Sequence, residues 1–272
     1  MLLSTYRYTK SHLIIRKLAL AAVLLTFSYQ AWSNETKQNE NITYERIISL
    51  APHITELIYS AGAGEKLVGV VEYSDFPIAA DKLPIVGNST SINIESIIKL
   101  APDLIIAWKS GNRIQDIERL QSLGFEVWQT EIQQLEDIPN FIKTIGEKAG
   151  TVKTALFKSS ELLEILNKTK QQYENQKVIN AFYQIWHQPL MTMNGKQFIS
   201  LALEICQANN IFTDLPLLAS EVNLESVIQR NPQVILLGGE SAFQDKWYLY
   251  WLRYHKLKAI KNQQHYTLHN DQ

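Results

Sequence analysis

Short apolar runs alternate with amphipathic segments along most of this chain. Four β-branched runs in its first half predict buried strands, because near-continuous apolar runs are typical of a parallel sheet covered on both faces. These runs are residues 46–50, 67–71, 104–108 and 125–128. Segments between them, at 55–63, 95–100 and 113–123, have helical spacing and end at glycine or proline. The alternation predicts an α/β lobe.

A long amphipathic stretch follows this lobe. Residues 151–176 contain no glycine or proline, and apolar positions recur at helical spacing among lysines and glutamates. The α/β rhythm then resumes, with strands predicted at 178–186 and 234–237 and a helix at 198–206. We therefore predict an α/β fold in which two lobes with mostly parallel sheets are joined by one long α-helix.

An internal repeat supports two related lobes. The segment NIESIIKLAPDLII at 93–106 recurs as NLESVIQRNPQVIL at 223–236. In each copy an asparagine is placed to cap a short helix, a glutamate lies in the first turn, and a proline ends the helix before a strand. Glu95 and Glu225 stabilise these turns by about 0.3–1 kcal/mol through the helix dipole. As a symmetry-related pair they also suit a partner built from two like subunits, such as a dimeric membrane permease.

The N-terminus has the pattern of an export signal. Four basic residues precede the apolar run at 18–27, and Ala31-Trp32-Ser33 offers small residues at both cleavage-specifying positions. The run is shorter than the roughly 20 residues that span a bilayer, although an uncleaved anchor stays open as an alternative. We expect a signal peptide at 1–33, cleaved before Asn34, followed by a first lobe at 34–150, a connecting helix at 151–176 and a second lobe at 177–272.

Composition and motifs exclude several function classes. The 26 basic and 27 acidic residues are spread along the chain, with a formal net charge of -1, so the basic footprint of a nucleic-acid binder is absent. The sequence has no G-x-S-x-G, H-E-x-x-H, C-x-x-C or P-loop motif, and we expect no enzymatic activity. The only cysteine, Cys206, lies far from the apolar run, which argues against a lipoprotein anchor.

Candidate ligand contacts follow the predicted strands, because small-molecule sites in α/β proteins favour the carboxyl ends of strands and crevices between lobes. The candidates are Tyr73, Ser74, Asp75, Trp108, Trp186, His187 and His53. Simpler readings stay open: the loop at 72–77 as a plain turn, the two tryptophans as core residues, and His53 as part of a helix start. His187 is either a hydrogen-bonding group or a metal ligand.

Several segments together resemble one known family, the periplasmic cobalamin-binding proteins of the helical-backbone class of ABC-transporter substrate-binding proteins. They are SLAPHITE at 49–56, YSDFP at 73–77, NIE at 93–95, PDLIIAWKSGN at 102–112 and FYQIWHQP at 182–189. The resemblance covers residues 46–271. It implies Rossmann-like lobes bridged by a rigid helix, a corrinoid held edge-on in the cleft, little hinge motion, and delivery of the ligand to an ABC permease.

The resemblance also implies roles for single residues. Tyr73 and Trp108 match ligand-facing positions of the family, and Asp271 matches the start of its last contacting loop. Glu95 and Glu225 match the carboxylates that dock onto arginines of the permease. We expect a monomeric periplasmic protein that has no metal and no cofactor apart from the cobalamin it transports.

One departure from the family lies at the C-terminus. Relatives continue past the position of Asp271 with an arginine-containing loop and a helix, whose cysteine pairs with the counterpart of Cys206. This chain stops at Gln272, so we expect a truncated second lobe and an unpaired thiol.

Three other functions stay open. The same fold could bind a ferric siderophore or haem, although an anionic siderophore would favour arginines, and the candidate loops contain mainly aromatic residues and Lys109. A periplasmic metallo-enzyme would require His53, His187, Asp75 and Glu72 to converge. An interaction protein without a ligand would bury Trp108 and Trp186 inside their own lobes.

Overall fold

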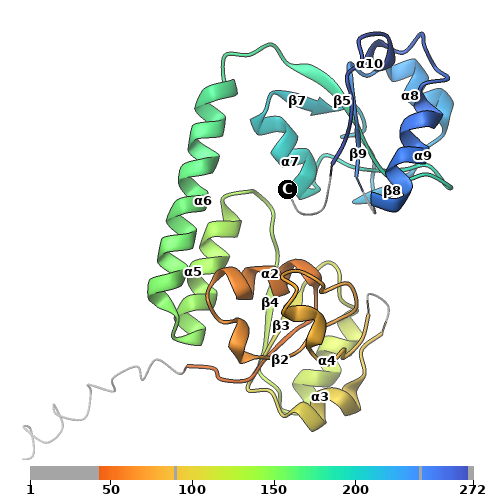
Figure 1. Ribbon diagram of the computed structural model, residues 1–272. Coiled ribbons are helices and arrows are strands. Elements are labelled where there is room, and N and C mark those ends of the chain that lie inside the picture. Colours follow the sequence, from red (N-terminus) through yellow and green to blue (C-terminus); the bar gives the residue numbers. More distant parts are fainter. Residues whose placement is uncertain (1–42, 89–90, 239–240, 269–272) are drawn as a thin grey trace, which may run out of the picture. The chain divides into compact units, whose positions relative to one another are not determined.

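The structure is a computed structural model that describes residues 43–88, 91–238 and 241–268 (Figure 1). From Thr43 onwards the chain forms one compact unit. The expected signal peptide at 1–33 and the expected contact Asp271 lie outside the described residues. Within the described ranges, no helix is long and apolar enough to cross a membrane.

The first lobe is built on a parallel sheet with the strand order β2-β1-β3-β4. Its strands are β1 (Ile47–Ser49), β2 (Leu67–Gly69), β3 (Leu104–Trp108) and β4 (Val127–Thr130). Its helices are α2 (Pro52–Ser60), α3 (Ile94–Leu100), α4 (Ile114–Ser122) and α5 (Asp137–Ala149), with short 3₁₀ turns η1 (Gly64–Lys66) and η2 (Ala80–Lys82). The four predicted strands and three predicted helices of this half are confirmed, with ends displaced by up to three residues.

Alternate residues of each strand enter two different cores, as the period of two in a strand requires. Ile47 and Ile106 pack with residues of α2 and α5, whereas Ile48 and Ile105 pack with residues of α3 and α4. The sheet is therefore covered on both faces, which is why β1, β2 and β3 are mainly apolar. Because all four strands are parallel, their carboxyl ends and the loops that follow them share one edge.

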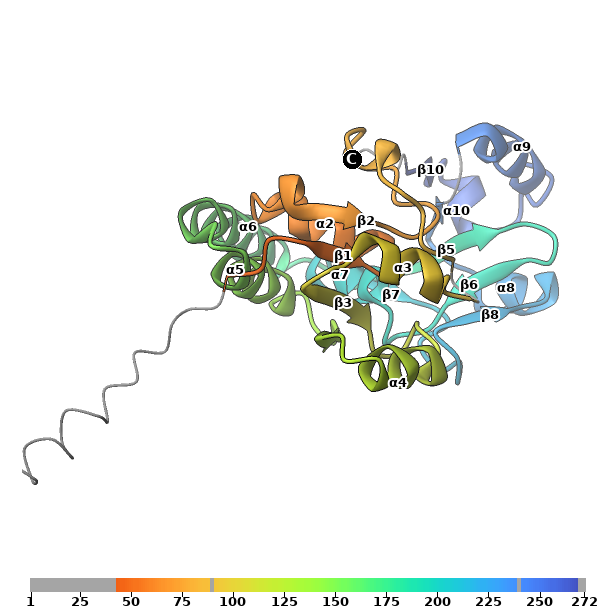
Figure 2. The same ribbon diagram turned by 90° about the horizontal axis from the view of Figure 1, so that it is seen from below.

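The predicted connecting helix is α6 (Val152–Tyr173), which packs lengthwise against α5 (Figures 1 and 2). A Cβ added at Gly146 of α5 would lie 2.1 Å from Cβ of Ala155, so the absence of a side chain permits the close approach of the two helices. The hydroxyl of Thr151 donates to the carbonyl of Ala61 at 2.7 Å. The start of α6 is therefore tied to the first lobe.

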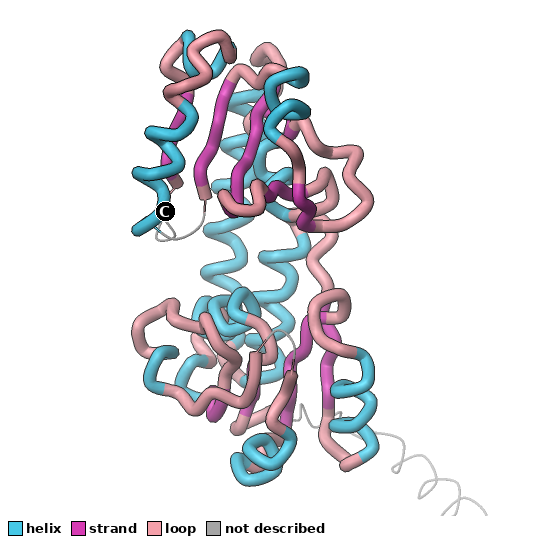
Figure 3. Tube along the Cα trace, turned by 90° about the vertical axis from the view of Figure 1, so that its right-hand side faces the viewer, coloured by secondary structure: helices cyan, strands magenta, loops and turns pink. Residues whose placement is uncertain are grey.

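The second lobe contains a six-stranded sheet with the order β10-β9-β5-β6-β8, in which β7 also pairs with β5. Its strands are β5 (Ile179–Trp186), β6 (Met191–Met193), β7 (Ala208–Asn210), β8 (Ala219–Glu221), β9 (Val234–Leu237) and β10 (His265–Thr267). Its helices are α7 (Phe198–Ile205), α8 (Leu224–Arg230), α9 (Ser241–Trp251) and α10 (Lys258–Lys261). The strands β7, β5, β9 and β10 are parallel, and β6 and β8 add an antiparallel extension. Figure 3 shows the strands of the two lobes as separate sets.

The sequence repeat corresponds to α3 and α8. Asn93 accepts a hydrogen bond from the backbone N–H of Ser96 at 3.0 Å, and Asn223 accepts one from Ser226 at 2.8 Å. Both helices end in a left-handed residue followed by proline. The predicted caps are confirmed, and the first-turn acids Glu95 and Glu225 are both exposed.

Candidate functional site

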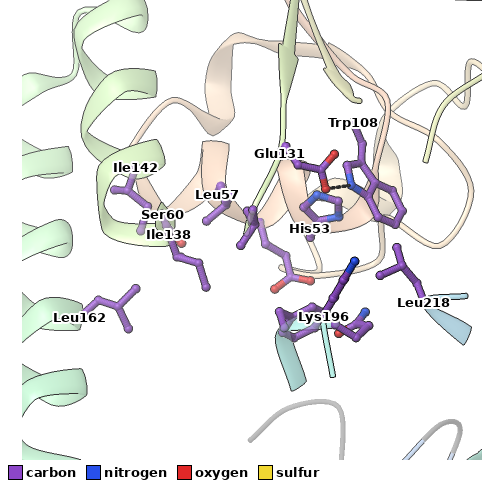
Figure 4. A pocket seen from close by; sticks show the side chains of 14 residues that line it. His53, Leu57, Ser60, Trp108, Glu131, Ile138, Ile142, Leu162, Lys196 and Leu218 are labelled. Carbon is purple, nitrogen blue, oxygen red and sulfur yellow. Dashed lines mark hydrogen bonds between the residues drawn. The ribbon is translucent and has the colours of Figure 1, made fainter. Parts of the chain in front are cut away.

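A cavity of about 340 Å³ lies at the carboxyl edge of the first sheet, with walls from both lobes (Figure 4). Its apolar side is formed by residues of α2, α5 and α6, and its polar end by groups on α2, the end of β3 and the loop after β4. Leu162 of the connecting helix α6 lines the cavity, and the first-lobe lining residues are His53, Glu56, Leu57, Ser60, Trp108, Glu131, Ile132, Ile138 and Ile142. Those from the second lobe are Lys196, Gln197, Phe198 and Leu218. The cavity therefore combines apolar walls with a few convergent polar groups, as ligand sites commonly do.

The indole of Trp108 is held from several directions. Its Nε1 donates to Oε1 of Glu131 at 3.3 Å, and its backbone N–H donates to Oδ1 of Asn112 at 2.7 Å. The ring lies so close to Gly111 that a Cβ at this glycine would be 1.9 Å from Cε3 of the indole. Trp108 is therefore fixed in the wall of the cavity before any ligand arrives.

Glu131 also fixes the loop that follows Trp108. Its two carboxylate oxygens accept hydrogen bonds from the backbone N–H and the hydroxyl of Ser110, both at 3.0 Å. Nδ2 of Asn112 donates to the carbonyl of Leu50 at 2.9 Å, which ties the same loop to the start of α2. The charge-assisted bonds of Glu131 and the amide bond of Asn112 together preorganise the loop.

His53 lies beside Trp108 in the first turn of α2. The two rings form an edge-to-face pair with centroids 5.0 Å apart and an interplanar angle of 88°. Burial lowers the pKa of His53, and the charge of Glu131 offsets part of this effect. The neutral imidazole is therefore favoured near pH 7, and it can donate or accept one hydrogen bond.

Glu56 lies one helical turn after His53 and lines the same cavity. Burial raises the pKa of Glu56, and the nearby charge of Asp75 raises it further. Lys196 approaches from the second lobe, and Figure 4 shows its side chain pointing towards the end of the cavity where His53 and Trp108 lie. The polar end thus carries charges of both signs.

The predicted loop at 72–77 lies outside the lining of this cavity. Tyr73 is 79% exposed and has a positive φ of 66°, and Asp75 is also exposed. Ser74 is buried, and its oxygen accepts a hydrogen bond from the hydroxyl of Thr55 at 3.2 Å. Ser74 therefore supports the loop from beneath, while Tyr73 and Asp75 are accessible to a ligand.

Trp186 and His187 belong to an aromatic cluster of the second lobe and also lie outside the cavity lining. His187 stacks on Trp247 of α9 with centroids 6.2 Å apart and meets Tyr250 edge-on at 4.6 Å. Burial lowers the pKa of His187. Trp186 is 41% exposed and packs against Trp247. Of the seven candidates, His53 and Trp108 thus line this cavity, whereas Tyr73, Ser74 and Asp75 line a separate hollow of about 50 Å³.

A family model described as periplasmic binding protein matches residues 47–272. The chain belongs to the periplasmic binding protein family. Among curated proteins, it is 33% identical over 240 residues to the vitamin B12-binding protein of Vibrio parahaemolyticus, covering 88% of this chain and 86% of the relative. It is 34% identical over 208 residues to the vitamin B12-binding protein of Yersinia pestis, covering 76% and 74%.

Solved structures agree with this family assignment. This periplasmic binding protein matches the crystal structure of the periplasmic vitamin B12 binding protein BtuF of Vibrio cholerae with a TM-score of 0.78 and 34% identity, covering 84% of this chain and 89% of the other. A periplasmic heme binding protein from Pseudomonas aeruginosa matches with a TM-score of 0.68 and 20% identity, covering 79% of each chain. The second match shows a shared fold. The predicted two-lobe α/β architecture is confirmed.

Sequence reasoning missed Glu56, Glu131 and Lys196 as lining residues of this periplasmic binding protein. Glu131 directly follows β4, so the strand-end rule that selected Trp108 applies to it equally. Glu56 lies three residues after His53, which places both on one face of α2. Lys196 precedes α7 in a loop with no comparable strand pattern, and only the structure reveals its position.

The geometry bears on the metallo-enzyme alternative. Across residues 43–88, 91–238 and 241–268, no group of three or more His, Cys, Asp or Glu side chains is placed to share a metal ion. His53 and His187 belong to separate clusters, one beside Trp108 and one beside Trp247. The convergence that this alternative requires is therefore not observed in the described part of the chain.

Proposed function

We propose that this periplasmic binding protein captures cobalamin or a related corrinoid in the periplasm and delivers it to the permease of an ABC importer. The observation that carries the proposal is the similarity to the vitamin B12-binding proteins, at 33–34% identity over most of the chain. The heme-binding proteins that share the fold are only 15–20% identical. The corrinoid assignment is therefore favoured over haem.

The chemistry of the cavity is compatible with part of a corrinoid. A corrinoid has a flat macrocycle with apolar faces and a periphery of amide side chains, and it is much larger than about 340 Å³. Only one edge of such a ligand can enter the cavity. The fixed indole of Trp108 offers an apolar surface, and His53, Glu56 and Glu131 offer hydrogen-bonding groups.

Further parts of the proposal concern residues away from the cavity. Tyr73, Asp75, Trp186 and His187 would contact the portion of the ligand that the cavity does not hold, with Ser74 supporting Tyr73 from below. Asp271 would contribute from the last loop. We further propose that residues 1–33 direct export as a cleaved signal peptide and that the mature chain is monomeric.

Glu95 and Glu225 would dock onto a dimeric permease. The support for this role is that both carboxylates are exposed and occupy equivalent first-turn positions of the repeated helices α3 and α8. Ion pairs between these two glutamates and basic residues of a permease would affect the orientation of docking and the association rate more than the affinity.

Titration of the purified protein with cyanocobalamin, followed by quenching of tryptophan fluorescence, tests the central proposal. We expect binding with a micromolar or lower Kd, stoichiometric at one ligand per chain. A folded protein that binds haem or a ferric siderophore at this level, but not cyanocobalamin, would refute the corrinoid function.

A further inference from the structure

The polar end of the cavity contains more negative than positive groups. Two carboxylates, Glu56 and Glu131, and one ammonium group, Lys196, line it among the described residues. A third carboxylate, Asp75, lies close enough to Glu56 to influence its titration. Burial lowers the pKa of His53, which favours its uncharged form. A ligand group at this end therefore meets a net negative field.

Both carboxylates retain capacity to accept hydrogen bonds. The carboxylate of Glu56 forms no hydrogen bond or ion pair with any residue that the structure describes, and Glu131 uses its carboxylate oxygens for Trp108 and Ser110. Burial and the charge of Asp75 raise the pKa of Glu56; when ionised, each of the two carboxylates offers about four lone-pair sites and has no donor. A ligand group that approaches these oxygens must therefore donate hydrogen bonds, as a primary amide does.

We infer that Glu56 and Glu131 make this site selective for corrinoids whose peripheral side chains are amides, and that they reject corrinoids carrying a carboxylate at the same position. This inference rests on the proposed corrinoid function and specifies the chemical class of ligand. Specificity of this kind arises because the rejected ligand meets a repulsive group, in addition to losing an attractive one. The same field acts against the propionates of haem.

The size of the effect follows from Coulomb's law. Two like charges at about 8 Å, with an effective dielectric constant of about 20 to 30, weaken binding by about ten- to thirtyfold. Lys196 lies at the same end with the opposite charge, so it reduces this discrimination. Neutralising a carboxylate and neutralising the lysine must therefore change the selectivity in opposite directions.

A structural role for Glu131 alone would produce a different pattern. If Glu131 only positions Trp108, its loss weakens the binding of amide and acid forms of the ligand equally. A purely structural effect therefore leaves the ratio of the affinities for the amide and the acid unchanged, whereas loss of charge repulsion changes it. This ratio is the quantity to measure. Glu56 forms no contact with Trp108 among the interactions described, and Glu56→Gln is therefore the cleaner variant.

The test compares cyanocobalamin with its b-, d- and e-monocarboxylic acids, each of which has one peripheral amide hydrolysed to an acid. Affinities are measured by fluorescence titration at neutral pH for the wild type, Glu56→Gln, Glu131→Gln and Lys196→Met. Glu118→Gln is the matched control, because Glu118 is exposed on α4 and does not line the cavity. Circular dichroism confirms that each variant is folded.

We expect the wild type to bind at least one acid about ten- to thirtyfold more weakly than cyanocobalamin. The ratio should fall towards one in Glu56→Gln and Glu131→Gln, rise in Lys196→Met, and stay unchanged in Glu118→Gln. Equal affinities of the wild type for all four ligands, or a ratio that neither glutamine variant changes, would overturn the inference alone. A folded wild type that binds none of the four ligands would overturn the proposed function as well.

Discussion

Replacing Gly111 by alanine tests the role of Trp108 without touching Trp108 itself. The new Cβ would lie 1.9 Å from Cε3 and 2.4 Å from Cδ2 and Cζ3 of the indole, far inside van der Waals contact. Gly111 is not among the glycines with positive φ, so the backbone accepts alanine. The ring must therefore leave its position.

The expected magnitudes follow from the contacts that the ring would lose. The hydrogen bond from Nε1 to the Glu131 carboxylate contributes about 1.5–3 kcal/mol when its acceptor is charged. The edge-to-face contact with His53 contributes about 0.5–1.5 kcal/mol. Because Trp108 is only partly buried, relaxation will reduce these values, and we expect a loss of about 1–3 kcal/mol in the free energy of unfolding, typical of overpacking.

Ligand affinity should fall more than stability. If the displaced indole no longer stacks on the corrinoid, about 2 kcal/mol of binding free energy is lost, or about thirtyfold in Kd. The assay is titration of Gly111→Ala with cyanocobalamin, beside urea unfolding of the same preparation.

Gly64→Ala is the matched control. A Cβ at Gly64 would lie 2.3 Å from the ring of Tyr59, which is also a severe aromatic clash in the same lobe but outside the cavity lining. We expect a similar loss of stability and an unchanged Kd. If Gly111→Ala binds cyanocobalamin like the wild type, or if Gly64→Ala loses the same affinity, the reasoning about a fixed Trp108 is wrong.

Three further predictions concern stability. Trp251→Phe removes the hydrogen bond that Nε1 of Trp251 donates to Oε1 of Gln184 at 2.7 Å in the core of the second lobe. This change should lower the free energy of unfolding, measured in urea, by about 2–3 kcal/mol. Asn223→Ala removes the cap of α8 and should cost about 1 kcal/mol in the same assay. His265 is buried with both ring nitrogens unbonded to any described residue, and burial lowers its pKa from the usual 6.5. The unfolded chain therefore binds the proton more readily, so stability should fall as the pH drops below about 6.5, and His265→Phe should reduce this slope.

Each of these predictions has a control and an outcome that contradicts it. The control for Trp251 is Trp247→Phe, which removes a buried indole on the same helix that forms no hydrogen bond with Gln184. If both variants lose the same free energy of unfolding, the hydrogen bond from Trp251 to Gln184 does not contribute to stability. For Asn223 the control is Asn223→Ser, because serine can also cap the helix. If Asn223→Ser is as destabilising as Asn223→Ala, capping is not the cause of the loss. For His265, a urea midpoint that shifts equally with pH in wild type and His265→Phe would assign the pH dependence to other groups.

Local patterns predicted most of the first lobe. The β-branched runs correspond to β1, β2, β3 and β4, because strands covered on both faces are near-continuously apolar and stand out along the sequence. The repeated helices were predictable because capping asparagine and terminal proline act on their neighbours along the chain. Part of the second lobe was not predicted: β6 (MTM) and β8 (ASE) lie in no β-branched run, whereas the equally short β1 and β2 lie within the runs at 46–50 and 67–71.

The candidate site was predicted in part. The strand-end rule identified Trp108, and His53 and Trp108 do meet at 5.0 Å. It did not identify the apolar side of the cavity, because Ile138, Ile142 and Leu162 read as ordinary helix core positions until α5 and α6 pack beside the sheet. It also selected Trp186 and His187, which pack against Trp247 of α9 and lie outside the lining of this cavity; their contact with a ligand stays a prediction.

The sequence by itself therefore determined most strands and helices of the first lobe and the presence of two related units around a long helix, since these properties depend on spacing, capping and local burial. Only the tertiary structure decided which side chains share the cavity. Glu56, Glu131 and Lys196 are separated by up to 140 positions, and neither helical nor strand periodicity shows that these three side chains meet. The parallel sheet brings its strand ends to one edge, and the packing of helices and of the second lobe then selects the charges that face a ligand there.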